Sequence, residues 1–351
     1  MSTLQISLAL AGLLLLLVVL LQGVWSSRLN RPRQAASESS DPSTVVASDA
    51  DPLTREDPSF EPVFDSSLEA LTTLTSPEKK ATLDALIDVI APIAVDSQVS
   101  GEAALAAMPA TRRAGSKPFA VEGLSVETGE WELPAAGQRY SAFQVGVQLA
   151  NRTGALNQIE YSEFVMKTQA FADAVGGEPE FPEMHEEVAR ARELDQFASQ
   201  HDAQLSFTLR AASIAWSPGY VQQNAARLGF VAGAIPGRMV LPGAQAQAPI
   251  LGLSFDPQAA MSEDPEQTPL RELTLSLDVP QVPRSEQPFA RMCDIALKLS
   301  SSMDGVIMDD NGNRIRAEGM EVINADLEKL YDTLDGRELS AGSLLGRRLF
   351  S

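Results

Sequence analysis

The sequence predicts an α+β protein in which helices cover one face of antiparallel sheets, behind a hydrophobic N-terminal helix and a flexible linker. Three observations support this fold class. Residues 1–27 are uncharged, apolar patterning resumes near residue 81 and lasts to about residue 335, and an internal repeat divides that region in two. Short stretches of alternating apolar residues indicate strands, and apolar residues three or four positions apart indicate helices. Strands and helices in this order favour an α+β sandwich.

Residues 1–27 are predicted to be a transmembrane anchor. They contain no charged side chain, and Leu8 to Leu21 is almost wholly aliphatic, which is long enough for a helix to cross a hydrocarbon core. A cleaved signal peptide fits less well, because no basic side chain precedes this long apolar stretch and no small-x-small site follows it. Arg28, Arg31 and Arg33 come next, so the positive-inside rule places the N-terminus outside and the remaining chain in the cytoplasm.

Two segments lack sustained apolar patterning. Residues 28–80 are rich in Ser, Asp, Pro and Thr, and they cannot bury enough apolar surface to offset the entropy of ordering, which predicts a flexible acidic linker. Residues 336–351 are predicted to be a short flexible tail. An alternative for this tail is that its sequence LLGRRLF is a docking peptide.

Composition excludes several classes of function. The formal net charge of −20 and the pI near 4.5 repel phosphates, so nucleic acid is not an expected partner. Cys293 is the single cysteine, which rules out an intramolecular disulfide and a cysteine-based zinc site. His185 lies in an acidic helical stretch and His201 in a polar connector, and both are expected to be ordinary solvated residues. No metal site is predicted.

An internal repeat with an offset of 128 residues, from position 145 to position 273, indicates two related units. Asn157 falls on Ser285, both good helix N-caps, and Gly177 falls on Gly305, each where a helix should stop. The alternating residues Val145, Val147 and Leu149 fall on Leu273, Leu275 and Leu277, and the helical stripe Tyr161, Phe164, Val165, Thr168, Phe171 and Val175 falls on Phe289, Met292, Cys293, Ala296, Leu299 and Met303. Agreement of strand, cap, stripe and stop favours duplication, with units at 81–200 and 202–335.

The predicted elements follow the same order in both units. In the first we expect strands at 83–95, 119–126, 131–133 and 143–149, and helices at 101–108, 160–175 and 184–197. In the second we expect strands at 204–210, 230–239, 250–255 and 273–277, helices at 219–228 and 289–303, a hairpin at 306–316 and a closing helix at 320–334. The hairpin turns at Asp309 to Asn313, which lacks the spaced donors of a calcium loop.

No pattern typical of an enzyme is present. The sequence has no GxSxG, HExxH or GxxxxGK[ST] motif and no Cys/His pair. Paired carboxylates are abundant, but an acidic chain supplies them by composition alone. We therefore expect neither catalysis, nor a cofactor, nor a small-molecule substrate.

Four stretches are distinctive: the anchor ending in GVWSSRLNR, the acidic-to-polar linker, the run LTLSLDVPQ, and the segment FARMCDIALKLSSSMDGVIMDDNGNRI followed by a final helix. Together they resemble the ZipA family of bacterial cell-division proteins. The resemblance covers the anchor and residues 202–334. It implies a split β-α-β fold whose open sheet face binds the C-terminal tail of FtsZ, the tubulin-like division polymer. It also implies an inner-membrane anchor, a cytoplasmic domain and a place at the division septum.

The sequence departs from this family in its organisation. The family is expected to carry one such domain behind a long Pro- and Gln-rich linker, whereas this chain has two predicted units behind a short one. The first unit, residues 81–200, is then a degenerate copy and the second, residues 202–335, is the ZipA C-terminal-like domain.

Matching motif to motif assigns the partner-binding face to the second unit. The six positions are Leu205, Phe207, Ile235, Ser254, Thr274 and Ser276. Because Leu273, Leu275 and Leu277 must face the helices, Thr274 and Ser276 face outward. The same alternation also allows Leu205 and Phe207 to be core residues, with Ser206 and Thr208 outward, and the sequence leaves both registers open.

Two functions are compatible with these features. The resemblance implies a membrane-anchored adaptor that binds the FtsZ tail and tethers the Z-ring to the inner membrane. The alternative is an envelope scaffold whose duplicated domain binds another division or cell-wall protein. The polar residues Gln144 and Gln148 in the first unit, and the Ser and Thr residues in the second, favour the scaffold if the two sheets leave no open groove.

Overall fold

The computed structural model describes residues 32–35, 82–243 and 249–351. The predicted membrane anchor at 1–27 and nearly all of the predicted linker at 28–80 lie outside the described residues. Among the helices that are described, none is both long enough and apolar enough to cross a membrane.

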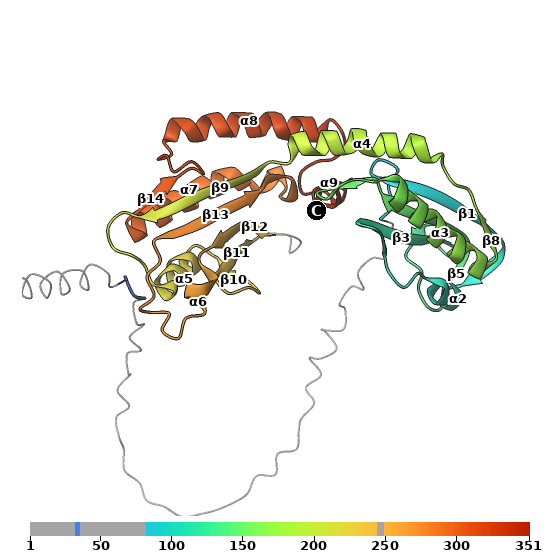
Figure 1. The fold of residues 1–351 in the computed structure, drawn as a ribbon, viewed down its shortest axis with the longest axis horizontal. Helices are drawn as coiled ribbons and strands as arrows, with labels where there is room; N and C mark the ends of the chain where they lie inside the picture. The colour runs from blue at the N-terminus through green and yellow to red at the C-terminus, as the bar shows by residue number, and fades with distance from the viewer. Residues whose placement is uncertain (1–31, 36–81, 244–248) are drawn as a thin grey trace, which may run out of the picture.

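The described chain is an α+β structure with two six-stranded antiparallel sheets, one in an N-terminal module (residues 82–201) and one in a C-terminal module (residues 204–335) (Figure 1). This confirms the predicted α+β class. A further two-stranded sheet lies in the N-terminal module. The elements of the N-terminal module are β1 (Asp88–Ser100), α2 (Gly101–Ala107), β2 (Arg113–Ala114), β3 (Lys117–Ser125), β4 (Trp131–Glu132), β5 (Arg139–Gln148), β6 (Ala150–Asn151), β7 (Gly154–Ala155), α3 (Gln158–Val175), β8 (Gly177–Pro179) and α4 (Met184–His201).

Among the described residues, the C-terminal module has six strands where the N-terminal module has eight, and its closing helix is one residue longer. Its elements are β9 (Gln204–Ala211), α5 (Pro218–Arg227), β10 (Val231–Ala232), β11 (Arg238–Pro242), β12 (Pro249–Ser254), α6 (Pro257–Ala260), β13 (Glu272–Asp278), the 3₁₀ turns η2 (Val279–Gln281) and η3 (Arg284–Glu286), α7 (Pro288–Met303), β14 (Gly305–Met308) and α8 (Ala317–Asp335). The strand predicted at 230–239 is interrupted, because the chain turns between β10 and β11 at Gly237, whose φ is +76°.

The strands of the two sheets follow the same order. The first sheet runs β2-β3-β5-β1-β8, and the second runs β10-β11-β12-β13-β9-β14. In each module the central strand is followed by a long helix and then by the edge strand, as β5-α3-β8 and as β13-α7-β14. Helices α3 and α7 end at Val175 and Met303, the positions that the predicted offset pairs.

The starts of these two helices differ. Asn157 caps α3 with a complete capping box, in which its side chain accepts from the amides of Ile159 and Glu160. Ser285, expected to cap α7, instead lies in the 3₁₀ turn η3, and the N-cap is Gln287 in a left-handed conformation. The helix therefore begins at Pro288, whose fixed φ suits the first turn.

Replacement of Asn157 by alanine should lower the free energy of unfolding by about 1–2 kcal/mol, because two helix N–H groups lose their acceptor. Asn157→Ser keeps a capping oxygen and should retain most of that stability. Urea unfolding followed by circular dichroism measures both variants. Equal midpoints for Asn157→Ala and the parent chain would contradict a stabilising role for the cap.

The apolar stripes of α3 and α7 face the sheets as predicted. Phe164 and Phe171 are fully buried and meet Phe119 and Phe143 edge-on, at ring-centroid distances of 6.2 and 5.2 Å. In the C-terminal module Phe289, Met292, Ala296, Leu299 and Met303 are all buried on α7. Each sheet thus has one face covered by its long helix. That helix does not cover the opposite face.

Residues 32–35 lie against the C-terminal module. The backbone of Arg33 pairs with that of Trp216, where its N–H donates to Ala215 O at 2.7 Å and its carbonyl accepts from Ser217 N at 2.8 Å. Its guanidinium donates to Met303 O at 3.2 Å. This short strand-like contact fixes the start of the linker on the C-terminal module.

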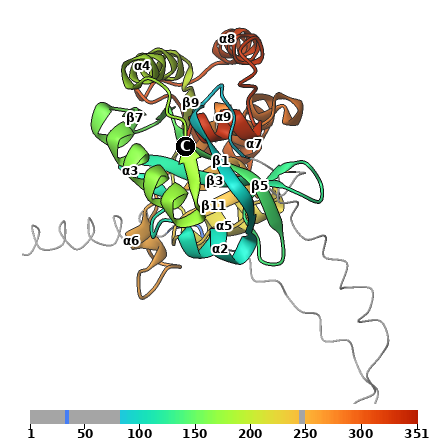
Figure 2. The same cartoon turned by 90° about the vertical axis from the view of Figure 1, so that its right-hand side faces the viewer.

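The C-terminal segment differs from the predicted flexible tail. Residues 344–349 form helix α9 (Leu344–Leu349), which lies below α4 and α8 in both views (Figures 1 and 2). Leu339, Leu349 and Phe350 are at most 1% exposed. These apolar side chains supply the burial that holds the segment in place, so the tail is part of the folded structure.

Candidate partner-binding site

The uncovered face of the C-terminal sheet is lined by hydroxyl groups. Strand β13 points Leu273, Leu275 and Leu277 into the core, so Thr274 and Ser276 project from the other side. Their cross-strand neighbours share this orientation. The side chains Ser206, Thr208, Ser254, Thr274 and Ser276 form this surface, called here the hydroxyl face. Thr274 lies between Thr208 and Ser254, and Ser276 lies opposite Ser206.

Three of the six predicted binding positions therefore meet on one surface. Ser254, Thr274 and Ser276 lie on adjacent strands of the hydroxyl face, as the alternation of β13 predicted. Ser276 is exposed, and the other two are half-buried.

The structure corrects the orientation of two other positions. Phe207 is 4% exposed and packs edge-on against Phe289 of α7, at 6.2 Å between ring centroids. Leu205 lies opposite Leu277 on the same helix-covered side and packs partly against the core. Both residues therefore belong to the core side of β9, and Ser206 takes the outward position that the alternative register allowed.

Ile235 lies apart from the hydroxyl face. It is 51% exposed in the turn between β10 and β11. With Phe230 and Met239 it lines a cavity of about 500 Å³ that also borders α5. Because α5 packs against α7, this cavity is on the helical side of the module. The six predicted positions thus occupy three different places.

The ends of the hydroxyl face are charged. At one end, Arg210 and Glu272 form an exposed ion pair at 2.6 Å. At the other end, a hollow of about 380 Å³ is lined by residues that include Gln204, Ser206, Ser276 and Asp278. Asp278 accepts two hydrogen bonds from Arg152 of the N-terminal module, each 2.7 Å long. The hydroxyl face therefore extends to the junction between the modules.

Sequence reasoning missed Met308 and Val240 at the margins of this face. Met308 of β14 lies opposite Thr208, and Val240 of β11 lies opposite Gly252. Both are half-buried apolar side chains at the lateral edges of a polar surface. Their positions beside Thr208 and Gly252 depend on which strands pair in the sheet. The alternation of residues within one strand does not predict that pairing.

Reactive groups are scarce in the described part of the chain. Burial raises the pKa of the Cys293 thiol to about 11, so this residue is a protonated thiol at neutral pH rather than a nucleophile. Within residues 32–35, 82–243 and 249–351, no three His, Cys, Asp or Glu side chains are grouped so that they could hold a metal ion.

The C-terminal sheet has helices on one face and mostly short hydroxyl side chains at the centre of the other. Residues 257–326 match the family described as ZipA, C-terminal FtsZ-binding domain. This segment is therefore similar to the ZipA family, as the sequence predicted. The matched segment includes β13 with Thr274 and Ser276, the helix α7 and the strand β14. No curated protein matches the chain at the threshold applied.

Proposed function

We propose that this protein is a membrane-anchored adaptor of bacterial cell division that binds the C-terminal tail of FtsZ and tethers the Z-ring to the inner membrane. The observation that supports it is the family match, because the matched segment contains the strand whose Thr274 and Ser276 project from the hydroxyl face. The peptide would lie across this face as an extended or helical segment, as sheet-face and groove binders do.

Membrane attachment follows from residues 1–27 in this proposal. The anchor crosses the inner membrane once with its N-terminus in the periplasm, and both modules lie in the cytoplasm at the septum. Arg33 is bound to the C-terminal module next to Trp216. A few extended residues span roughly 20 Å at most. The C-terminal module would therefore stay close to the membrane surface, while residues 36–81 lead away to the N-terminal module.

The same proposal treats the two modules as tandem ZipA-like units. Their sheets share the strand orders β3-β5-β1-β8 and β12-β13-β9-β14, and their long helices end 128 positions apart in the chain, at Val175 and Met303. Duplication explains both correspondences. The unit at 202–335 is the FtsZ-binding copy, and the unit at 81–200 is the degenerate one.

A hydroxyl-lined face predicts modest affinity for one peptide. Apolar anchors contribute most of the energy of peptide capture, and on this surface apolar side chains lie at the margins, with Val231 and Val240 on one side and Val306 and Met308 on the other. Weak capture is sufficient for a tether, because a polymer presents many tails and a membrane presents many anchors, so that the effective concentration of each further tail is high.

The double substitution Thr274→Lys and Ser276→Lys should weaken binding of an FtsZ tail peptide by at least about tenfold, since two long cations would cover the centre of the face. Fluorescence anisotropy with the labelled peptide measures the affinity. The matched control is Leu297→Lys with Val322→Lys, which adds the same charge at two positions that are 56% and 62% exposed on α7 and α8. Equal affinities for the two folded double variants would exclude the hydroxyl face.

The scaffold function is the second candidate, and the polar character of the hydroxyl face favours it. An apolar peptide gains little on a surface of Ser and Thr side chains, whereas a folded partner with its own polar groups can satisfy them. Absence of FtsZ-tail binding by the unmodified protein, together with capture of another division or cell-wall protein that the lysine pair abolishes, would establish this function instead.

A further inference from the structure

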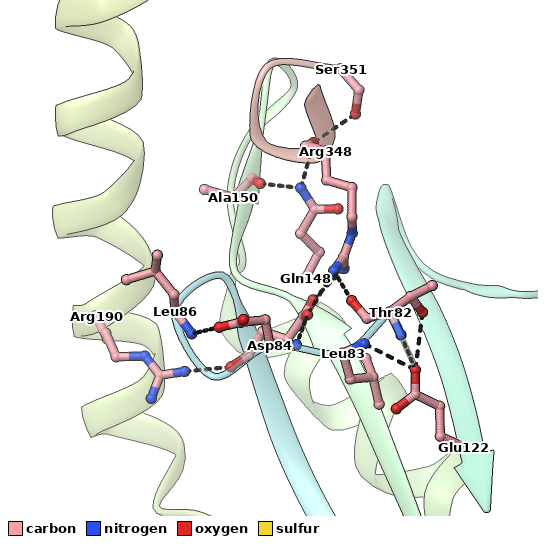
Figure 3. A network of polar contacts seen from close by, with 11 residues as sticks. Thr82, Leu83, Asp84, Leu86, Glu122, Gln148, Ala150, Arg190, Arg348 and Ser351 are labelled. Carbon is pink, nitrogen blue, oxygen red and sulfur yellow. Dashed lines mark hydrogen bonds and ion pairs between the residues drawn. The ribbon is translucent and has the colours of Figure 1, made fainter. Parts of the chain in front are cut away.

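The face of the N-terminal sheet that corresponds to the hydroxyl face is partly covered. Four of its outward positions are polar: Asp88 lies opposite Gln148, and Glu122 lies opposite Gln144. Asp88 and Glu122 are fully buried, and Gln148 is 1% exposed. Two segments from distant parts of the chain cover them, residues 82–86 and the C-terminal helix α9 (Figure 3).

The first covering segment binds Glu122. The backbone N–H groups of Thr82 and Leu83 both donate to Glu122 Oε1, the second at 3.0 Å, and Gln144 Nε2 donates to Glu122 Oε2 at 2.8 Å. Leu83 rests on Gly146, where an added Cβ would lie 2.4 Å from Leu83 Cδ2. Leu83 therefore fits against a position where no larger residue would leave room for it.

The second covering segment places an arginine on a buried carboxylate. Arg348 Nη2 donates to Asp88 Oδ1 at 2.6 Å and Nη1 donates to Asp88 Oδ2 at 3.0 Å, while Nη1 also donates to the carbonyl of Thr82. Gln148 Nε2 donates to the carbonyl of Arg348 at 2.8 Å. A buried carboxylate is costly unless it is paired and hydrogen-bonded, so Asp88 requires a cation in this position.

The same segment contacts the C-terminal module. Gln281 Nε2 donates to the carbonyl of Phe350 at 2.7 Å and to that of Arg347 at 3.2 Å. Leu349 and Phe350 are buried beside these contacts. The nine residues from Ser343 to Ser351 thus contact both modules. The Arg348 side chain binds Asp88 of the N-terminal module, and backbone carbonyls accept from Gln281 of the C-terminal module.

We infer that this face of the N-terminal sheet is a peptide-binding site for a cationic segment with an Arg-Leu-Phe sequence, and that the chain's own residues 343–351 occupy it. Asp88 selects the arginine through a paired, two-bond contact that lysine cannot reproduce. The site does not depend on the proposed FtsZ function. Its consequence is that the part of this face around Asp88 and Gln148 is not open to another partner while the segment is bound.

Hydrogen exchange of the full chain tests this inference. Arg348→Ala should raise the exchange rates of the amides of Leu83, Asp84 and Phe350 by about 100-fold, because both covering segments lose the contact that joins them. The amides of β13 should be unchanged. Leu344→Ala, at a 48% exposed position of the same helix, is the control and should change the rates far less. Unchanged protection in Arg348→Ala, or equal loss in both variants, would overturn the inference.

Binding of the segment in trans separates recognition from simple packing. A labelled peptide of residues 343–351, added to the Arg348→Ala chain, should bind at least about tenfold more tightly than the same peptide carrying Arg348→Ala. Asp88→Asn, introduced into that chain, should remove the difference. Equal binding of the two peptides, or binding of neither, would show that apolar packing alone holds the segment and would overturn the assignment of Asp88 as its receptor.

Discussion

Phe164→Ala is expected to lower the free energy of unfolding by about 3–5 kcal/mol, the range for removing a buried phenylalanine side chain. Phe164 is fully buried at the centre of an aromatic cluster in the N-terminal module. Its ring lies edge-on to Phe119, Tyr161 and Phe181, with centroid distances of 6.2, 5.7 and 6.2 Å. Truncation removes these ring contacts and leaves a cavity that the strands of the sheet cannot close by moving.

Urea unfolding followed by circular dichroism measures this loss. Phe164→Leu keeps most of the volume and should cost about 1.5 kcal/mol or less. The exposed position Leu297, in the C-terminal module, provides a control in which Leu297→Ala changes stability by no more than about 0.5 kcal/mol. Similar midpoints for Phe164→Ala and Leu297→Ala would contradict the packing of α3 on the sheet.

The long helices and their buried faces could be predicted because their signal is local. Apolar residues spaced three and four apart lie on one face of a helix and do not fit a strand. Phe164, Phe171 and Leu299 are buried, as that spacing predicts. The turn at Asp309 is local in the same way, because its carboxylate accepts from the amides of Asn311 and Asn313. Starts of elements were less predictable, as in β1, which begins at Asp88 after a turn rather than near residue 83.

The outward residues of β9 could not be predicted, for a physical reason. Leu205 and Phe207 alternate with Ser206 and Thr208, so the two pairs lie on opposite faces of the strand. The alternation does not show which of the two faces packs against the helices. The contact between Phe207 and Phe289 decides it, and that contact joins residues 82 positions apart in the chain, 207 and 289. The hydroxyl face is therefore a property of tertiary packing.

The C-terminal segment shows the same limit more strongly. Two adjacent arginines in LLGRRLF are typical of a solvated tail, and the alternative of a docking peptide named no receptor. The receptor is Asp88, 260 residues earlier in the chain. A carboxylate that is buried by residues 82–86, strand β5 and helix α9, which come from three parts of the chain, has no local signal, since acidic residues are abundant throughout this chain.

The two sheet faces have diverged in opposite ways within the proposed adaptor. The C-terminal one is lined by Ser and Thr side chains and ends in a hollow at the module junction. The N-terminal one holds buried charges and is partly covered by the chain's own segments. One chain then presents one partner-binding face, and multivalency would come from the number of anchors in the membrane rather than from the second module.

Arg348→Ala is expected to destabilise the N-terminal module by about 3–5 kcal/mol at neutral pH, because it leaves the fully buried Asp88 without its cation. The size of this effect should depend on pH. Burial already raises the pKa of Asp88 above its usual 3.8, although the hydrogen bonds and the charge of Arg348 lower it. Removal of Arg348 takes away the hydrogen bonds and the charge that lower the pKa of Asp88, while burial still raises it. The pKa of Asp88 is therefore higher in the variant than in the parent chain.

The sign of the pH dependence follows from that higher pKa. A carboxyl group whose pKa is higher in the folded chain than in the unfolded chain stabilises the fold most below its unfolded pKa, and this contribution is lost as pH rises through the folded pKa. Destabilisation by Arg348→Ala should therefore be smaller at about pH 5 than at about pH 8. Urea unfolding at the two pH values measures it, and Asp88→Asn with Arg348→Ala should abolish the difference. A pH-independent loss of stability would mean that Arg348 acts through packing and not through the charge of Asp88.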